Sequence, residues 1–202
     1  MKYLVSCLMA LVLVAAGFGL AGQFSNVGAT AQEAKKQEKK KNQRKNPWQG
    51  VRDAVAVLTP TKGNKAHGKV SFNFRRRQMT VVAHIEGLEP NSKHAIHIHQ
   101  FGDISMSDGK GTGGHYNPEM HDHGLPEKNM RHAGDLGNLQ ADARGVAHYE
   151  ITVDNLAIAG RKNPIIGRGV IVHAKPDDGG QPTGNAGARI AQGVIGVAQG
   201  NR

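Results

Sequence analysis

Residues 68–74, with the sequence GKVSFNF, set the pattern that most of the chain follows. Apolar and polar side chains alternate along this segment with a period of two, which is typical of a strand with one buried face. Similar runs stand on either side of it, at 54–58 and 79–85, and they end in turn residues such as Pro60 and Gly87. Short strands joined by turns in this way predict an antiparallel sheet.

Short strand-like runs separated by turns continue toward the C-terminus, at 146–153, 169–173 and 193–198. No convincing amphipathic helix interrupts them. The chain therefore predicts an all-β fold of seven or eight strands, an antiparallel Greek-key β-sandwich or barrel. Two long segments, 102–138 and 177–189, are rich in glycine and lack sustained periodicity. Loops this long are uncommon in a compact domain unless they carry function.

The N-terminus has the layout of a signal peptide at residues 1–31. Lys2 precedes an apolar run at 3–21, and Ala29-Thr30-Ala31 forms a small-x-small cleavage site. We expect an exported protein, periplasmic or extracellular. An uncleaved segment acting as a membrane tether stays open, because the apolar run is nearly long enough to span a bilayer. Cleavage removes Cys7, the only cysteine, so the mature chain has no disulfide.

Residues 32–50 form a basic segment that separates the signal from a domain at 51–202. Seven lysine and arginine side chains face two glutamates there, a local charge of 7 − 2 = +5 out of a total of +10. Such a block cannot bury a core, so we expect a disordered linker. It is either a solvated spacer or a contact for an anionic surface. No aromatic side chain stands among the lysines before Trp48, which argues against specific nucleic-acid binding.

Histidines concentrate in the middle of the chain, where seven of the eleven lie between residues 94 and 132. His97 and His99 are two residues apart in the strand that follows Asn91-Ser92, so their rings lie on one face of it. Further candidate ligands follow at His115, His123, His132, Asp135 and His173. Imidazoles with one carboxylate suit zinc or copper and do not suit calcium or magnesium. The sequence therefore predicts a metal site served by the long loops.

The segments around these residues resemble the metal-binding motifs of the copper/zinc superoxide dismutases. The matching segments are 95–103 (AIHIHQFGD), 115–118 (HYNP), 123–126 (HGLP), 131–138 (RHAGDLGN), 172–175 (VHAK) and 184–189 (GNAGAR). The resemblance spans residues 53–199 and fills all of the family's ligand positions. The chain resembles an exported, bacterial-type member of this family. The resemblance implies disproportionation of superoxide to dioxygen and hydrogen peroxide by a redox-cycling copper beside a structural zinc.

By this resemblance, every metal ligand can be assigned to a residue. Copper is bound by His97, His99, His115 and His173, and zinc by His115, His123, His132 and Asp135. His115 is then a bridging and catalytic residue, which carries a proton to the product. Asp177 accepts hydrogen bonds from His97 and His123 and fixes their rings. Arg189 holds the superoxide anion beside copper and attracts it from solution.

Some features depart from the family or leave alternatives open. The chain has Gln192 where the family has a cysteine, so the disulfide tie is absent, and the loop before Arg189 is short. The alternative to the enzyme is a non-catalytic protein that stores or delivers copper or zinc outside the cytoplasm. A homodimer stays open as well. Among the other histidines we expect His94 to make backbone hydrogen bonds, and the rest to be solvated: His67, His84, His121 and His148.

Overall fold

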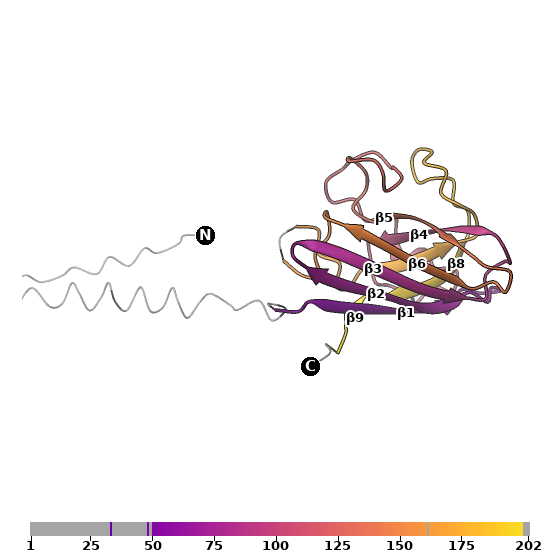
Figure 1. Cartoon of the computed structure of the whole chain (residues 1–202), viewed down its shortest axis with the longest axis horizontal. Helices are drawn as coiled ribbons and strands as arrows, with labels where there is room; N and C mark the ends of the chain where they lie inside the picture. Colours follow the sequence, from indigo (N-terminus) through magenta and orange to yellow (C-terminus); the bar gives the residue numbers. More distant parts are fainter. Residues whose placement is uncertain (1–32, 34–47, 49, 161, 200–202) are drawn as a thin grey trace, which may run out of the picture. The chain divides into compact units, whose positions relative to one another are not determined.

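The computed structural model describes residues 33, 48, 50–160 and 162–199, and within them the chain forms nine strands and one short 3-10 helix (Figure 1). The elements are β1 (Asp53–Pro60), β2 (His67–Arg75), β3 (Gln78–Glu86), β4 (Lys93–His99), η1 (Lys110–Thr112), β5 (Asp135–Gln140), β6 (Ala147–Val153), β7 (Gly169–His173), β8 (Arg189–Val194) and β9 (Gly196–Val197). The described domain is all-β, as the sequence predicts.

Neighbouring strands are antiparallel throughout, in the order β5-β4-β7-β8-β1-β2-β3-β6, with β9 paired to β1. The two ends of this order approach each other, because Ala141 after β5 bridges Ala147 at the start of β6. The sheet is thus a nearly closed barrel, which confirms the predicted fold class. Closure leaves little unpaired strand edge for association with other chains.

The alternation in the central hairpin β2–β3 places one face of each strand in the barrel core. Val70 and Phe72 from β2 and Val81 and Ile85 from β3 are fully buried. Burial of side chains of this size contributes about 1.5–3 kcal/mol each relative to exposure. The outward residues between them are exposed or half-buried, so this hairpin follows the sequence pattern residue by residue.

Two strands differ from the sequence prediction. β5 lies partly inside the segment 102–138 that we expected to be loop, and β8 starts at Arg189, four residues before the expected strand. Both strands are buried on both faces over much of their length. A strand of this kind does not alternate between apolar and polar residues, so its period of two is hidden.

Two long connections remain beside the strands, and they lie on the same side of the barrel (Figure 1). We call residues 100–134 the long loop and residues 174–188 the short loop. The expected signal peptide (1–31) and nearly all of the basic linker (32–50) fall outside the described residues. Among the residues that the structure describes, no helix is long and apolar enough to cross a membrane.

Candidate metal centre

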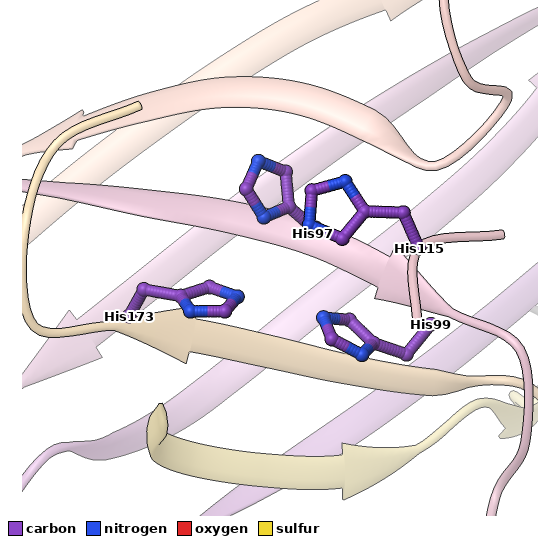
Figure 2. A group of neighbouring side chains, drawn as sticks. All are labelled: His97, His99, His115 and His173. Carbon is purple, nitrogen blue, oxygen red and sulfur yellow. The ribbon is translucent and has the colours of Figure 1, made fainter. Parts of the chain in front are cut away.

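Four histidines from distant parts of the chain meet at one side of the barrel (Figure 2). β4 carries His97 and His99, and β7, its neighbour in the sheet, ends at His173. The long loop returns to β4 through a bridge between His99 and His115, which adds the fourth ring. One ring nitrogen from each residue lies within 4.8 Å of the others, and all four residues are buried. The structure thus brings the predicted copper set together.

Three of these rings use one nitrogen for a hydrogen bond that fixes the ring. The contacts are His97 Nε2 with Asp177 Oδ2 (2.9 Å), His99 Nδ1 with Gly113 O (2.9 Å) and His173 Nδ1 with Gly187 O (3.2 Å). The other nitrogens, His97 Nδ1, His99 Nε2 and His173 Nε2, are buried without a hydrogen-bond partner among the described residues. A buried polar atom without a partner is costly. Three such atoms in one cluster fit a copper ion as the missing partner.

A second cluster shares His115 with the first and is built around Asp135. Its ligand atoms, from His115, His123, His132 and Asp135, also lie within 4.8 Å of one another. The Asp135 carboxylate is fully buried and stands 2.9 Å from His115 Nδ1, 3.0 Å from His123 Nδ1 and 3.2 Å from His132 Nδ1. Three imidazoles and one carboxylate form a closed donor set that suits zinc.

Burial and neighbouring charges set the protonation of these groups. Burial, followed by repulsion from nearby histidines, lowers the pKa of His173 to about 3, and burial lowers the pKa of His115 to about 4 despite its bond to Asp135. Burial alone would raise the pKa of Asp135, but hydrogen bonds from three histidines hold it well below its usual range. The neutral imidazoles of His115 and His173 and the ionised carboxylate of Asp135 are the forms that bind metal ions.

Asp177 in the short loop connects the two clusters. Its Oδ2 accepts from His97 Nε2 and its Oδ1 from His123 Nε2, both at 2.9 Å. The side chain of Asn138 makes two hydrogen bonds with the backbone of Asp177. Its Nδ2 donates to the Asp177 carbonyl at 2.9 Å, and its Oδ1 accepts from the Asp177 N–H at 2.7 Å. The structure therefore places Asp177 between the two histidines that the sequence assigned to it.

Arg189 reaches the rim of the four-histidine cluster from the start of β8. Its guanidinium donates to Gly109 O (2.6 Å), Thr112 Oγ1 (3.1 Å) and Gly113 O (2.6 Å) of the long loop. A pocket of about 160 Å³ lies at this point, lined by His99, Gly114, His115, His173, Thr183, Ala186, Gly187 and Arg189. Partial burial lowers the pKa of Arg189. The pocket nevertheless has a cation at its edge and imidazoles on its wall, so it favours a small anion.

Gln192 supplies a contact that the sequence did not predict. Its buried side chain donates from Nε2 to Met106 O (3.2 Å) and Ile104 O (3.4 Å), which joins β8 to the long loop. The chain has no cysteine here for a covalent tie, and the polar contact of Gln192 joins the strand to the long loop. No pattern in the sequence identifies it, since a lone glutamine in a strand is normally an outward residue.

The five other histidines make their own contacts. His94 bonds to His173 O and to Ser92 Oγ, as expected of a non-ligand, and exposed His67 bonds to Lys65 O. His121 is half-buried against Arg131 O, so the expectation that it is solvated is only partly right. His84 and His148 contact each other, which the expectation of separate solvated rings missed.

Comparisons with known proteins agree with this geometry. A family model described as copper/zinc superoxide dismutase matches residues 66–195. An extracellular superoxide dismutase (Cu-Zn) of Brugia pahangi is 39% identical over 155 residues, which cover 72% of this chain and 76% of that protein. A crystal structure of the clock protein EA4 has 37% identity and a TM-score of 0.67, covering 73% of this chain and 96% of that chain.

A nearly closed antiparallel barrel with two adjoining histidine-rich clusters defines a β-barrel metalloprotein. The chain belongs to the copper/zinc superoxide dismutase family, and its class of enzyme and its two metal cofactors follow from that membership and from the clusters. The sequence predictions of family, enzyme class and metal pair are confirmed.

Proposed function

We propose that the four-histidine cluster binds copper, that the cluster around Asp135 binds zinc, and that superoxide reacts in the pocket beside Arg189. The observation that carries this assignment is the set of three buried ring nitrogens that lack a partner among the described residues. They converge in a cluster that shares His115 with a second one. Two superoxide anions and two protons then yield dioxygen and hydrogen peroxide.

Copper, when bound, supplies a one-electron couple, whereas zinc is redox-silent and orders the loop. His115 is placed to move a proton. Its Nδ1 lies 2.9 Å from Asp135 and 3.3 Å from His132 Nδ1, which leaves Nε2 for the copper side. Nε2 can hold a proton only while it does not bind copper, and at the wall of the pocket it would then pass that proton to the reduced product. His115 can thus deliver a proton directly to the site where substrate binds.

Arg189 binds and orients the anion. Its guanidinium is held by three hydrogen bonds to the long loop, so little side-chain freedom remains to be lost when substrate enters. The domain at 51–202 has a net charge of 10 − 1 − 5 = +4 once Lys2 and the basic linker are left out, and this charge adds a general attraction for superoxide. A protein that only stores or delivers metal needs no cationic pocket, so Arg189 supports the enzyme over that alternative.

Gly113 couples the substrate residue to a copper ligand. Its carbonyl accepts from Arg189 Nη2 at 2.6 Å and from His99 Nδ1 at 2.9 Å. Any displacement of this part of the long loop therefore moves the arginine and turns the imidazole together. The position of the loop controls both the pocket and the copper cluster.

The cellular setting of the enzyme follows from the N-terminal sequence and from the relative. We place the mature domain at 51–202 outside the cytoplasm, after a signal peptide at 1–31, because the Brugia pahangi relative is named extracellular. The basic linker at 32–50 then lies in the same compartment. Its excess charge of +5 suits an anionic surface.

Metal content and turnover, measured on one purified sample, test the assignment. His173→Gln should lose copper and superoxide consumption and keep its zinc, because His173 belongs to only one cluster. His67→Gln is the matched control, since this exposed histidine lies outside both clusters. Full copper content and full turnover in His173→Gln would contradict the proposal.

A further inference from the structure

A pair of histidines that belongs to neither buried cluster lies on the outer surface of the barrel. His84 in β3 and His148 in β6 are directly opposite in the antiparallel register of two neighbouring strands (Figure 1). Their Nδ1 atoms are 3.1 Å apart and their ring centroids 4.3 Å apart. The neighbours of His84 in sequence, Ala83 and Ile85, point into the core, so the pair faces outward.

Glu86 determines which nitrogen of His84 is available. Its Oε1 lies 3.0 Å from His84 Nε2. An ionised carboxylate only accepts hydrogen bonds, so Nε2 carries the proton of the neutral ring and Nδ1 keeps its lone pair. That lone pair points toward His148. A carboxylate that orients an imidazole through the far nitrogen is the usual support of a histidine that binds a metal ion.

The geometry points to an auxiliary Cu²⁺ site between His84 Nδ1 and His148 Nδ1, separate from the two buried clusters. Imidazole nitrogens bind such ions at about 2.0–2.1 Å, so two ligands near a right angle stand about 3 Å apart. The two nitrogens already have this separation before an ion binds. Two neutral imidazoles favour Cu²⁺ over the other divalent first-row ions, and Zn²⁺ binds more weakly.

Exposure makes this site different in kind from the buried centre. The side chain of His84 is 42% exposed and that of Glu86 is 50% exposed. Water therefore completes the coordination of the ion, and the ion exchanges freely with the medium. An exported protein with such a pair takes up copper reversibly on its surface. None of the three residues touches the pocket beside Arg189.

The test uses the full chain with both buried centres already loaded with copper and zinc. Cu²⁺ is then titrated in equilibrium dialysis, and the added ion is examined by electron paramagnetic resonance. We expect one additional equivalent of copper whose spectrum shows two nitrogen ligands. All eleven histidines lie in the part of the chain that the structure describes, so each alternative pair can be checked by substitution.

Two variants remove the ligands and two others serve as comparison. His84→Gln and His148→Gln should each lose the additional equivalent, whereas His67→Gln, an exposed histidine on the adjacent β2, should keep it. Glu86→Gln should bind it about 10-fold more weakly, because the orienting carboxylate is lost. Superoxide consumption and zinc content should be unchanged in all four, which shows that each variant is folded.

Three outcomes would overturn the inference. The wild-type protein could bind no copper beyond its two centres, which would make the pair a plain hydrogen bond between rings. The additional equivalent could survive in both His84→Gln and His148→Gln. It could also be lost in His67→Gln, in which case the two-ligand assignment is wrong. The ligand assignment of the buried centre is independent of all three results, because His173→Gln tests it separately.

Discussion

The hairpin β2–β3 and the long loop of residues 100–134 belong to the same barrel but bury different kinds of side chain. The hairpin buries apolar residues such as Phe72 and Ile85, whereas most of the side chains that the loop buries are polar, among them His115, His123 and His132. Apolar burial is favourable by itself. Burial of imidazoles is costly unless their nitrogens are satisfied. The two regions therefore depend on different sources of stability, one of them the bound ions.

Metal removal should separate the two regions most strongly. An ion present at about 1,000 times its Kd stabilises a fold by about 4 kcal/mol, so chelation should lower the free energy of unfolding by at least that amount. Hydrogen exchange should accelerate more in the long loop than in β2–β3, because the loop can open locally whereas the hairpin exchanges mainly through global unfolding. A thiol reductant should have no effect, because a chain with one cysteine forms no internal disulfide.

Thermal unfolding of the metal-loaded and metal-free proteins, each with and without reductant, provides the measurement. Peptide-resolved hydrogen exchange on the same four samples assigns any change to a region. Equal acceleration in the hairpin and the long loop would mean that the barrel responds as one unit, and the contrast between the two regions would be wrong.

One substitution in each region should separate stability from metal binding. His115→Ala should lose most of the activity and weaken both metal sites, because its ring belongs to both clusters. Phe72→Ala should cost about 3–5 kcal/mol of stability as a cavity in the core and leave both metals bound below the new unfolding temperature. Metal content, turnover and thermal unfolding of both variants are the measurements. Normal copper and zinc in His115→Ala would exclude the bridge.

The sequence predicted the two regions to different depths. The alternation of apolar and polar residues identified β2 and β3, because each has one solvent-exposed face. It missed β5 and the start of β8, because both are buried on two faces. All seven proposed ligands were candidates from their residue types, the motif resemblance assigned each one to a metal, and the structure brings them together in two clusters. Periodicity alone would have identified only His97 and His99 in β4, because the other ligands come from segments that are far apart in the sequence.

Contacts made by common side chains were beyond the reach of sequence patterns. The contact of His84 with His148 depends on the register between β3 and β6, and the tie of Gln192 depends on where the long loop lies against β8. A register cannot be derived from one strand read by itself. These contacts belong to neither the apolar pattern nor the metal motifs, which is why only the folded structure shows them.

Arg189→Ala should affect the function of the loop region and leave its metal content unchanged. We expect the second-order rate with superoxide to fall by about 10-fold, since local attraction of an anion accelerates encounter by at least that factor. The remaining rate should respond less to salt, which screens exposed charges over about 8 Å at physiological ionic strength. Arg144→Ala is the control, because this arginine is 81% exposed on a turn and its substitution removes the same net charge. Equal losses in both variants would mean that only the net charge matters.

The smallest expected effect concerns the polar tie between the barrel and the long loop. Gln192→Ala removes the amide that donates to Met106 O and Ile104 O. A hydrogen bond of this kind contributes about 0.5–1.5 kcal/mol, so the variant should lose about 1 kcal/mol of stability. The effect should be local. Hydrogen exchange should accelerate around residues 104–113, and turnover should fall moderately, because Gly113 positions both Arg189 and His99.

A matched control distinguishes this local effect from a general loss of stability. Gln140→Ala removes an exposed amide that donates to the carbonyls of Asn91, Ser92 and Ala141, away from the long loop. It should cost at most a similar amount of stability and leave loop exchange and turnover unchanged. If both variants accelerate exchange in the long loop equally, the tie through Gln192 has no special role. The loop would then be held in place by the ions and by its other contacts, such as those of Arg189, and the contrast with the apolar hairpin would be sharper than we propose.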